Sequence, residues 1–135
     1  MSEYLFSYGT LQPEMAPGEI ASAVKTLRRV GDGFVQGTLY DLGDYPGAVL
    51  DQHSNRKIEG TVFRISDSVA VLPQLDAYEE FDPMLPERSL FVRVKWPVQL
   101  EDGRTIDCWV YRYNGETDSL KIFQTGKFSK KRLAS

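Results

Sequence analysis

The sequence predicts an α+β domain in which a mixed, curled β-sheet or a small β-barrel is flanked by two or three helices. Residues 90–100 alternate apolar and polar side chains, as a strand with one buried face does. Two other stretches carry apolar side chains at helical spacing, and short segments rich in β-branched and aromatic residues lie between them. This order of elements is typical of the α+β class, although the period alone does not distinguish a barrel from an open sheet.

The first predicted elements are a strand and a helix. Residues 4–8 are mostly apolar and aromatic, and Gly9 after them predicts a strand that runs into a turn. Residues 17–30 predict a helix, because four apolar side chains recur at spacings of four, three and three residues: Ile20, Val24, Leu27 and Val30. The glycines in residues 31–33 are expected to end this helix.

The middle of the chain alternates strand signals with turn signals. We expect strands at residues 34–41, 48–50 and 58–65, which are rich in residues that favour extended backbone. Glycine and proline at residues 43–47 predict a turn, since they supply the dihedral angles that turns need. The polar residues 51–57 predict a hairpin loop.

A second helix and a long hairpin complete the predicted domain. Ser66 or Asp67 is expected to cap a helix that carries three apolar residues at helical spacing: Val69, Leu72 and Leu75. Because proline damages a helix interior, we expect this helix to start near Pro73, after a tighter turn. The strand at residues 90–100 is followed by a turn and a return strand at residues 105–113.

Length and charge limit the classes of protein to consider. The chain has 135 residues and a formal net charge of −3, which predicts one domain over residues 1–135 and gives no sign of a nucleic-acid partner. Its apolar runs are too short for a membrane span, and its first residues lack the parts of a signal peptide. We therefore expect a cytoplasmic protein that binds neither membrane nor nucleic acid, with a monomer as the default state.

A basic C-terminal segment departs from this acidic balance. Residues 121–132 hold five basic side chains and no acidic one. We interpret residues 121–135 as a solvated tail, because the basic run is short and apolar residues interrupt it. The alternative is a tail that touches nucleic acid or an acidic partner.

The small numbers of cysteine and histidine residues exclude several kinds of site. The chain has one cysteine, Cys108, and one histidine, His53. These numbers exclude an intramolecular disulfide, a cysteine-cluster zinc site and a two-histidine metal centre. We expect no metal and no cofactor, so the chemistry of an enzyme with this sequence must come from carboxylates, tyrosines and backbone amides.

Glu79 is the first candidate for such chemistry. Leu72, Leu75 and Glu79 lie three and four residues apart, so on a helix they share one face. Desolvation on an apolar face raises the pKa of a carboxyl, which suits it to general acid–base catalysis near neutral pH. The alternative is a frayed helix end with Glu79 as a solvated acid. Asp76 is expected to be a cap or surface charge, with a partner of Glu79 as the alternative. Arg93 is expected to be a surface or cross-strand charge, with a partner of Glu79 or of an anionic substrate as the alternative.

The second candidate is the end of the first predicted strand, at four residues: Tyr8, Gly9, Thr10 and Leu11. Successive backbone N–H groups at such a glycine turn can converge on an anion. A plain turn between strand and loop is the alternative. Tyr45 and Tyr111 are typical of packing aromatics whose hydroxyl seeks a partner.

These motifs together resemble the gamma-glutamylcyclotransferase-like superfamily, and within it the small gamma-glutamylamine-cyclotransferase-like branch. The Tyr-Gly-Thr-Leu of the family stands at residues 8–11, and its Gly-x-Leu-Tyr-Asp-x-Gly-x-Tyr-Pro pattern at residues 37–46. Its catalytic signature, Leu-Asp-x-x-Glu, stands at residues 75–79, and an aromatic-x-Arg strand follows at residues 91–93. The main departure is Glu80, where the family usually has glycine.

The resemblance implies an enzyme that releases 5-oxoproline and a free amine from a gamma-glutamyl amide, without an enzyme nucleophile or a metal. Glu79 would be the general acid/base. The substrate would be bound by Tyr8, Gly9, Thr10, Leu11, Tyr45 and Tyr111. A non-catalytic member of the same fold that binds a small metabolite or a protein is an alternative. Another is a hydrolase in which Glu79 activates water and glutamate is released.

Overall fold

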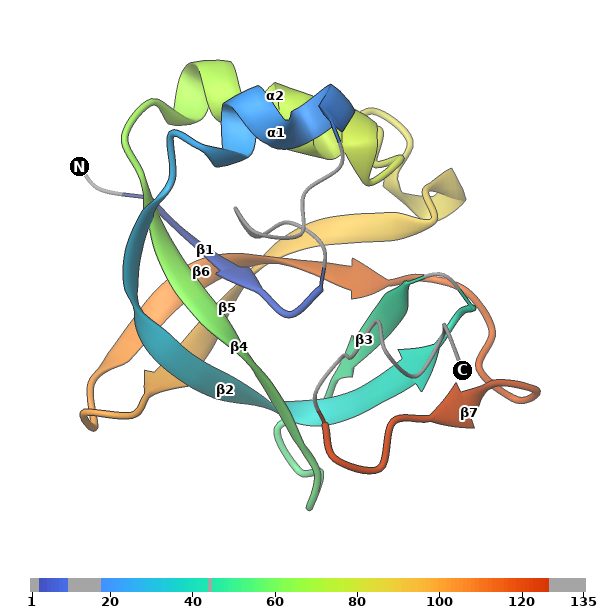
Figure 1. Ribbon diagram of the computed structural model, residues 1–135. Coiled ribbons are helices and arrows are strands. Elements are labelled where there is room, and N and C mark those ends of the chain that lie inside the picture. Colours follow the sequence, from blue (N-terminus) through green and yellow to red (C-terminus); the bar gives the residue numbers. More distant parts are fainter. Residues whose placement is uncertain (1–2, 10–17, 44, 127–135) are drawn as a thin grey trace.

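The computed structural model describes residues 3–9, 18–43 and 45–126 (Figure 1). Two α-helices and one short 3₁₀ turn are described: α1 (Gly18–Val24), α2 (Ser68–Tyr78) and Pro86–Arg88. The strands are β1 (Glu3–Ser7), β2 (Arg28–Asp41), β3 (Pro46–Leu50), β4 (Lys57–Ile65), β5 (Phe91–Leu100), β6 (Thr105–Tyr113) and β7 (Lys121–Ile122).

Five strands close into a mixed β-barrel. The pairing runs from β1 through β4, β2, β5 and β6, and a parallel contact between β6 and β1 closes the ring. β3 bridges β2 and β6, and β7 pairs with β2. Figure 1 shows α1 and α2 together over one side of the barrel. The predicted α+β class is confirmed, and the barrel replaces the open sheet as its architecture.

Buried side chains form two hydrophobic clusters. One lies between the helices and the barrel and includes Leu75 of α2 and Tyr111 of β6. The other gathers inward-facing strand residues such as Val98 of β5 and Val110 of β6. β5 and β6 contribute to both clusters because neighbouring residues of a strand point to opposite faces of the sheet. The helices are therefore held against the outer face of the same hairpin that helps to fill the barrel.

The predicted helix at residues 17–30 is too long. It ends at Val24, and Arg28 already begins β2. Thr26 binds the carbonyl oxygen of Ala23 through its backbone N–H, at 3.2 Å, and through its hydroxyl, at 2.7 Å. A turn held in this way ends the helix, so the last part of the apolar pattern belongs to a strand.

The glycines that were expected to stop the helix lie inside β2. Gly33 pairs with Leu100 of β5, at the contact that joins β2 to β5 in the barrel. A Cβ atom at Gly33 would stand only 2.7 Å from the backbone oxygen of Gln99. Glycine is therefore needed here for the close approach of two strands, a role that is common for glycine within strands.

The second helix begins before Pro73, so the expected start at that residue is wrong. Asp67 caps α2, and its side chain accepts a hydrogen bond of 3.2 Å from the backbone N–H of Ala70. Pro73 lies inside the helix at an exposed position. There, water can replace the backbone hydrogen bond that proline cannot make.

The first part of the predicted basic tail is packed rather than solvated. Lys121 and Ile122 form β7, and Phe123 is buried, with its backbone N–H bonded to the carbonyl oxygen of Leu39 at 2.8 Å. Residues 127–135 lie outside the described part of the chain. Neither of the described α-helices has the length and apolar character to cross a membrane.

Candidate active site

A cavity of about 200 Å³ lies where the last turn of α2 meets the end of β1 and the outer face of β5 and β6. Its wall includes five of the residues that the sequence predicted for the site: Tyr8, Gly9, Tyr45, Glu79 and Tyr111. The other two, Thr10 and Leu11, lie outside the described residues. Segments far apart in the sequence thus meet around one small, mainly apolar space.

Glu79 reaches this cavity because α2 is anchored one turn earlier. Leu75 is fully buried against the barrel, and the backbone N–H of Glu79 bonds to the Leu75 carbonyl oxygen at 2.9 Å. Glu79 is the C-cap of the helix and is half-buried. The shared face predicted for these residues therefore leads from the core to the cavity wall.

The carboxyl group of Glu79 has no charged partner in the part of the chain that the structure describes. Among the described residues, it forms no ion pair and no side-chain hydrogen bond. Burial, followed by the negative charge of Glu80, raises the pKa of Glu79 to about 7 from an ordinary value of 4.5. A carboxyl in this state can give and take a proton near neutral pH.

The Tyr8 hydroxyl forms part of the framework of the wall. It donates a hydrogen bond to the carbonyl oxygen of Tyr111 and accepts one of 3.3 Å from the backbone N–H of Ala48. These bonds connect the end of β1 to β6 and β3. Burial, with a smaller effect of the nearby Glu79 charge, raises the pKa of Tyr8. The hydroxyl is therefore neutral and already occupied by backbone groups.

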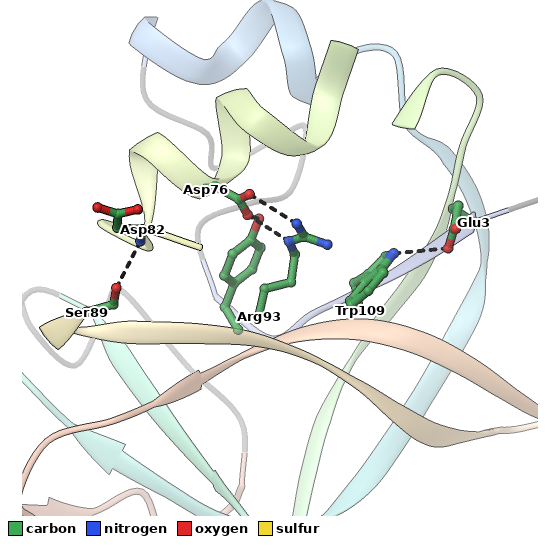
Figure 2. A network of polar contacts seen from close by, with 7 residues as sticks. Glu3, Asp76, Asp82, Ser89, Arg93 and Trp109 are labelled. Atoms are coloured by element: carbon green, nitrogen blue, oxygen red, sulfur yellow. Dashed lines mark hydrogen bonds and ion pairs between the residues drawn. The ribbon is translucent and has the colours of Figure 1, made fainter. Parts of the chain in front are cut away.

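A second buried acid, Asp76, lies one helical turn before Glu79 and is paired. Arg93 of β5 binds it in a fork, from Nε to Oδ1 at 2.8 Å and from Nη2 to Oδ2 at 3.2 Å (Figure 2). The hydroxyl of Tyr111 donates a third hydrogen bond to Oδ1, at 2.7 Å. The expectation of Asp76 as a cap or surface charge is wrong, because its side chain is buried between α2 and the barrel, where Arg93 and Tyr111 bind it.

Arg93 is correspondingly a partner of Asp76 and does not pair with Glu79. Its guanidinium lies 4.4 Å from the ring centre of Trp109, whose Nε1 donates a hydrogen bond of 3.0 Å to Glu3. Figure 2 shows this row of side chains running from α2 toward β1. Sequence reasoning missed the network, although Asp76 and Arg93 both belong to the motifs. Only the packing of α2 against β5 shows that they meet.

Glu80 has a backbone conformation that favours glycine. Its φ is 56°, in the left-handed region. The N–H of Glu80 bonds to the Ala77 carbonyl oxygen at 3.3 Å, and that of Phe81 to the Asp76 carbonyl oxygen at 2.9 Å. This pattern is a Schellman motif, which commonly has glycine at this position. The glycine that the resemblance led us to expect after Glu79 thus has a structural reason.

A larger cavity, of about 470 Å³, is lined by residues of β2, of the start of β4 and of the segment 123–126. Its charged lining residues, which include Arg56, Lys57 and Glu101, are all exposed. It contains none of the residues that the sequence predicted for the site, and no buried acid or base. The smaller cavity is therefore the better candidate for chemistry.

The sequence as a whole identifies the family. The family described as gamma-glutamyl cyclotransferase, AIG2-like, matches residues 5–130. The chain belongs to this family. No functionally curated protein matches the sequence well enough to show a relationship.

Solved structures of other proteins show the same fold. An AIG2-like protein from Mus musculus has 17% identity and a TM-score of 0.71, over 95% of this chain and 88% of that one. Protein ytfP from Escherichia coli has 27% identity and a TM-score of 0.64, over 96% of this chain and 98% of that one. A structure named gamma-glutamyl cyclotransferase has 15% identity and a TM-score of 0.61, over 90% of this chain and 70% of that one.

Proposed function

We propose that this protein is a gamma-glutamyl cyclotransferase-type enzyme, which releases 5-oxoproline and a free amine from a gamma-glutamyl amide, with Glu79 as the general acid/base. The Glu79 carboxyl, which has no charged partner among the described residues and lines a small, mainly apolar cavity, is the observation that carries the proposal. With a pKa of about 7, both of its protonation states are populated near neutral pH. Membership of the family supports the class of reaction.

The proposed reaction takes place within the substrate. The α-amino nitrogen attacks the side-chain amide carbon, a new C–N bond closes the five-membered ring, and the bond to the leaving nitrogen breaks. Two protons leave the attacking ammonium, and two reach the departing amine, so no net proton and no water are consumed. Glu79 would accept a proton from the attacking α-amino nitrogen and deliver it to the leaving nitrogen. It would do so twice, once for each proton.

The cavity would supply orientation. Holding the amine and the carbonyl in a near-attack pose can contribute a large part of the barrier reduction. Tyr45, which packs against Phe91 at 6.0 Å between ring centres, and Tyr111 would act as walls. The hydroxyl groups of Tyr8 and Tyr111 already donate to a carbonyl oxygen and to Asp76, so we assign them packing rather than catalytic hydrogen bonds.

The turn after β1 would bind the charged parts of the substrate. Backbone N–H groups of Gly9 and of Thr10 and Leu11 are proposed to hold the substrate carboxylate or the developing oxyanion, which extends the prediction made for residues 8–11. Donors that are fixed before the reaction cost little reorganisation when charge develops.

A product assay tests the proposal. The protein is incubated with a panel of gamma-glutamyl amides, and 5-oxoproline and glutamate are quantified by mass spectrometry. We expect 5-oxoproline from the wild type and a loss of about 10²- to 10⁴-fold in Glu79→Gln, because a positioned acid/base contributes that much. Glu101→Gln, at an exposed residue remote from the cavity, is the matched control.

Two results would contradict this assignment. Full activity of a folded Glu79→Gln variant would remove Glu79 from the mechanism, and release of glutamate would indicate a hydrolase. The non-catalytic alternative predicts a third result. A gamma-glutamyl amide would then bind, as measured by calorimetry, without turnover by the wild type.

A further inference from the structure

Glu80 contributes a second carboxyl group to the wall of the same cavity. Glu79 is half-buried, whereas Glu80 is exposed, so the two acids occupy the inner and the solvent side of the wall. Within the described part of the chain, Glu80 forms no ion pair and no side-chain hydrogen bond. The negative charge of Glu80 can therefore interact with a ligand that enters the cavity.

The described lining of the cavity contains no cationic residue to balance these acids. The nearest candidate by sequence motif, Arg93, has its guanidinium bound to Asp76 and stacked on Trp109. Residues 10–17, which follow Gly9 in the sequence, also contain no lysine, arginine or histidine. The described part of the site is therefore negative, and the most exposed of its charges is that of Glu80.

This charge acts on one part of the substrate. The glutamyl half is the same in every gamma-glutamyl amide and carries one ammonium and one carboxylate, which cancel. Glu79 must lie beside the two reacting nitrogens in order to move protons between them. In a substrate placed in this way, the rest of the leaving amine would extend from Glu79 toward solvent, and Glu80 is the exposed acid of the lining.

We propose that Glu80 makes the enzyme prefer gamma-glutamyl amides whose leaving amine carries a second, positively charged group, as a diamine or polyamine does. This inference rests on the proposed function and names its substrate class. A carboxylate at the same position, as in a gamma-glutamyl amino acid, is disfavoured by like-charge repulsion, so Glu80 provides selection against one class as well as for another.

The size of the effect follows from the exposure of Glu80. Two unit charges about 4 Å apart in water interact strongly enough for roughly a fivefold preference. We expect about a fivefold higher kcat/KM for a cationic than for a neutral leaving amine, and a similar factor between neutral and anionic ones. These ratios decrease at high salt, because ions screen an exposed charge.

The experiment compares three gamma-glutamyl amides of matched length, formed from 1,4-diaminobutane, pentylamine and 4-aminobutyrate. Values of kcat/KM are measured at low and high salt for the wild type, Glu80→Gln and the control Glu101→Gln. In Glu80→Gln, the three values should converge. Ratios between substrates are the readout, because any change in the pKa of Glu79 or in stability affects all three amides alike.

The outcomes separate this inference from the proposed function. Turnover of all three amides at equal kcat/KM, or ratios that persist in Glu80→Gln, would overturn the inference and leave the function intact. If no amide yields 5-oxoproline, the proposed function fails. Calorimetry with the three intact amides then decides: tighter binding of the diaminobutane amide that is lost in Glu80→Gln supports the selection, and equal or absent binding rejects it.

Discussion

Two carboxyl groups one helical turn apart, at the end of α2, have opposite surroundings. Asp76 is only 6% exposed and accepts hydrogen bonds from Arg93 and Tyr111. Glu79 lines a cavity and has no charged partner within residues 3–9, 18–43 and 45–126, and its pKa is raised to about 7. Both acids are removed from bulk water, so burial alone does not explain the difference. The presence or absence of a cation makes one acid structural and leaves the other available for proton transfer.

The two environments depend on each other. The side chain of Asp76 ties α2 to β5 and β6, and its carbonyl oxygen accepts the Phe81 N–H that ends the helix. Glu79 lies between these two anchored points. We infer that the paired acid keeps the unpaired one at the cavity, and substitutions at the two positions should therefore have different consequences.

The largest expected effect on stability is that of Asp76→Asn. This change leaves the Arg93 guanidinium, whose side chain is 16% exposed, without its counter-charge. Breaking one half of a buried pair typically costs about 3–5 kcal/mol. Urea unfolding monitored by circular dichroism should show a loss of this size in the free energy of unfolding.

The double variant Asp76→Asn/Arg93→Met is the matched control. Removal of the unpaired guanidinium should restore part of the lost stability, since a buried pair replaced by neutral groups often costs little. A single variant as stable as the wild type would show that the Asp76 network does not hold α2 in place.

The second prediction concerns the pH dependence of stability. Because the folded pKa of Glu79, about 7, lies above the ordinary 4.5, the folded protein binds this proton more tightly than the unfolded chain. The resulting stabilisation is fully present below pH 4.5 and is lost as the pH rises through 7. The loss is about 3 kcal/mol. Asp76→Asn and Glu79→Gln should thus change stability in opposite directions at pH 8.

Unfolding free energies at pH 5 and pH 8 check this sign. Glu79→Gln removes the titrating group, so the difference between wild type and variant isolates its contribution from that of other acids. Equal pH dependence in both proteins would mean that Glu79 ionises at its ordinary pKa and that its surroundings are wet.

The prediction of the fold from sequence succeeded where the hydrophobic periodicity was strong. It failed where a glycine could either end a helix or permit a close contact between two strands. Residues 105–113 form β6 as expected, because hydrophobic alternation and the preceding turn agree. Gly33 was interpreted as a helix stop, although it permits the contact of β2 with Gln99 of β5. That contact joins segments more than 60 residues apart, so no local pattern contains it.

The candidate site shows the same division. The spacing of Leu72, Leu75 and Glu79 was sufficient to select Glu79 as a candidate, because helical periodicity is a local property. The pairing of Asp76 with Arg93 was not predictable in this way. It depends on how α2 crosses β5, and this crossing is set by the packing of the whole helix.

The smallest predicted effect separates charge from backbone at Glu80. Glu80→Gly relieves the left-handed strain at φ 56°, which costs a non-glycine residue about 1–2 kcal/mol. The greater freedom of glycine in the unfolded chain offsets part of this gain, so we expect a net stabilisation of about 1 kcal/mol. Glu80→Ala removes the same charge but keeps the strain, and it should gain no stability from the backbone.

Both substitutions should lower the pKa of Glu79 by the same amount, because both remove the neighbouring negative charge that helps to raise it. An NMR titration of the Glu79 carboxyl measures this change, and urea unfolding measures stability. If only the glycine variant lowers the pKa, the helix end itself must move and carry Glu79 with it. If neither does, burial alone sets the pKa of Glu79, and the contrast with Asp76 rests on the missing cation without any contribution from Glu80.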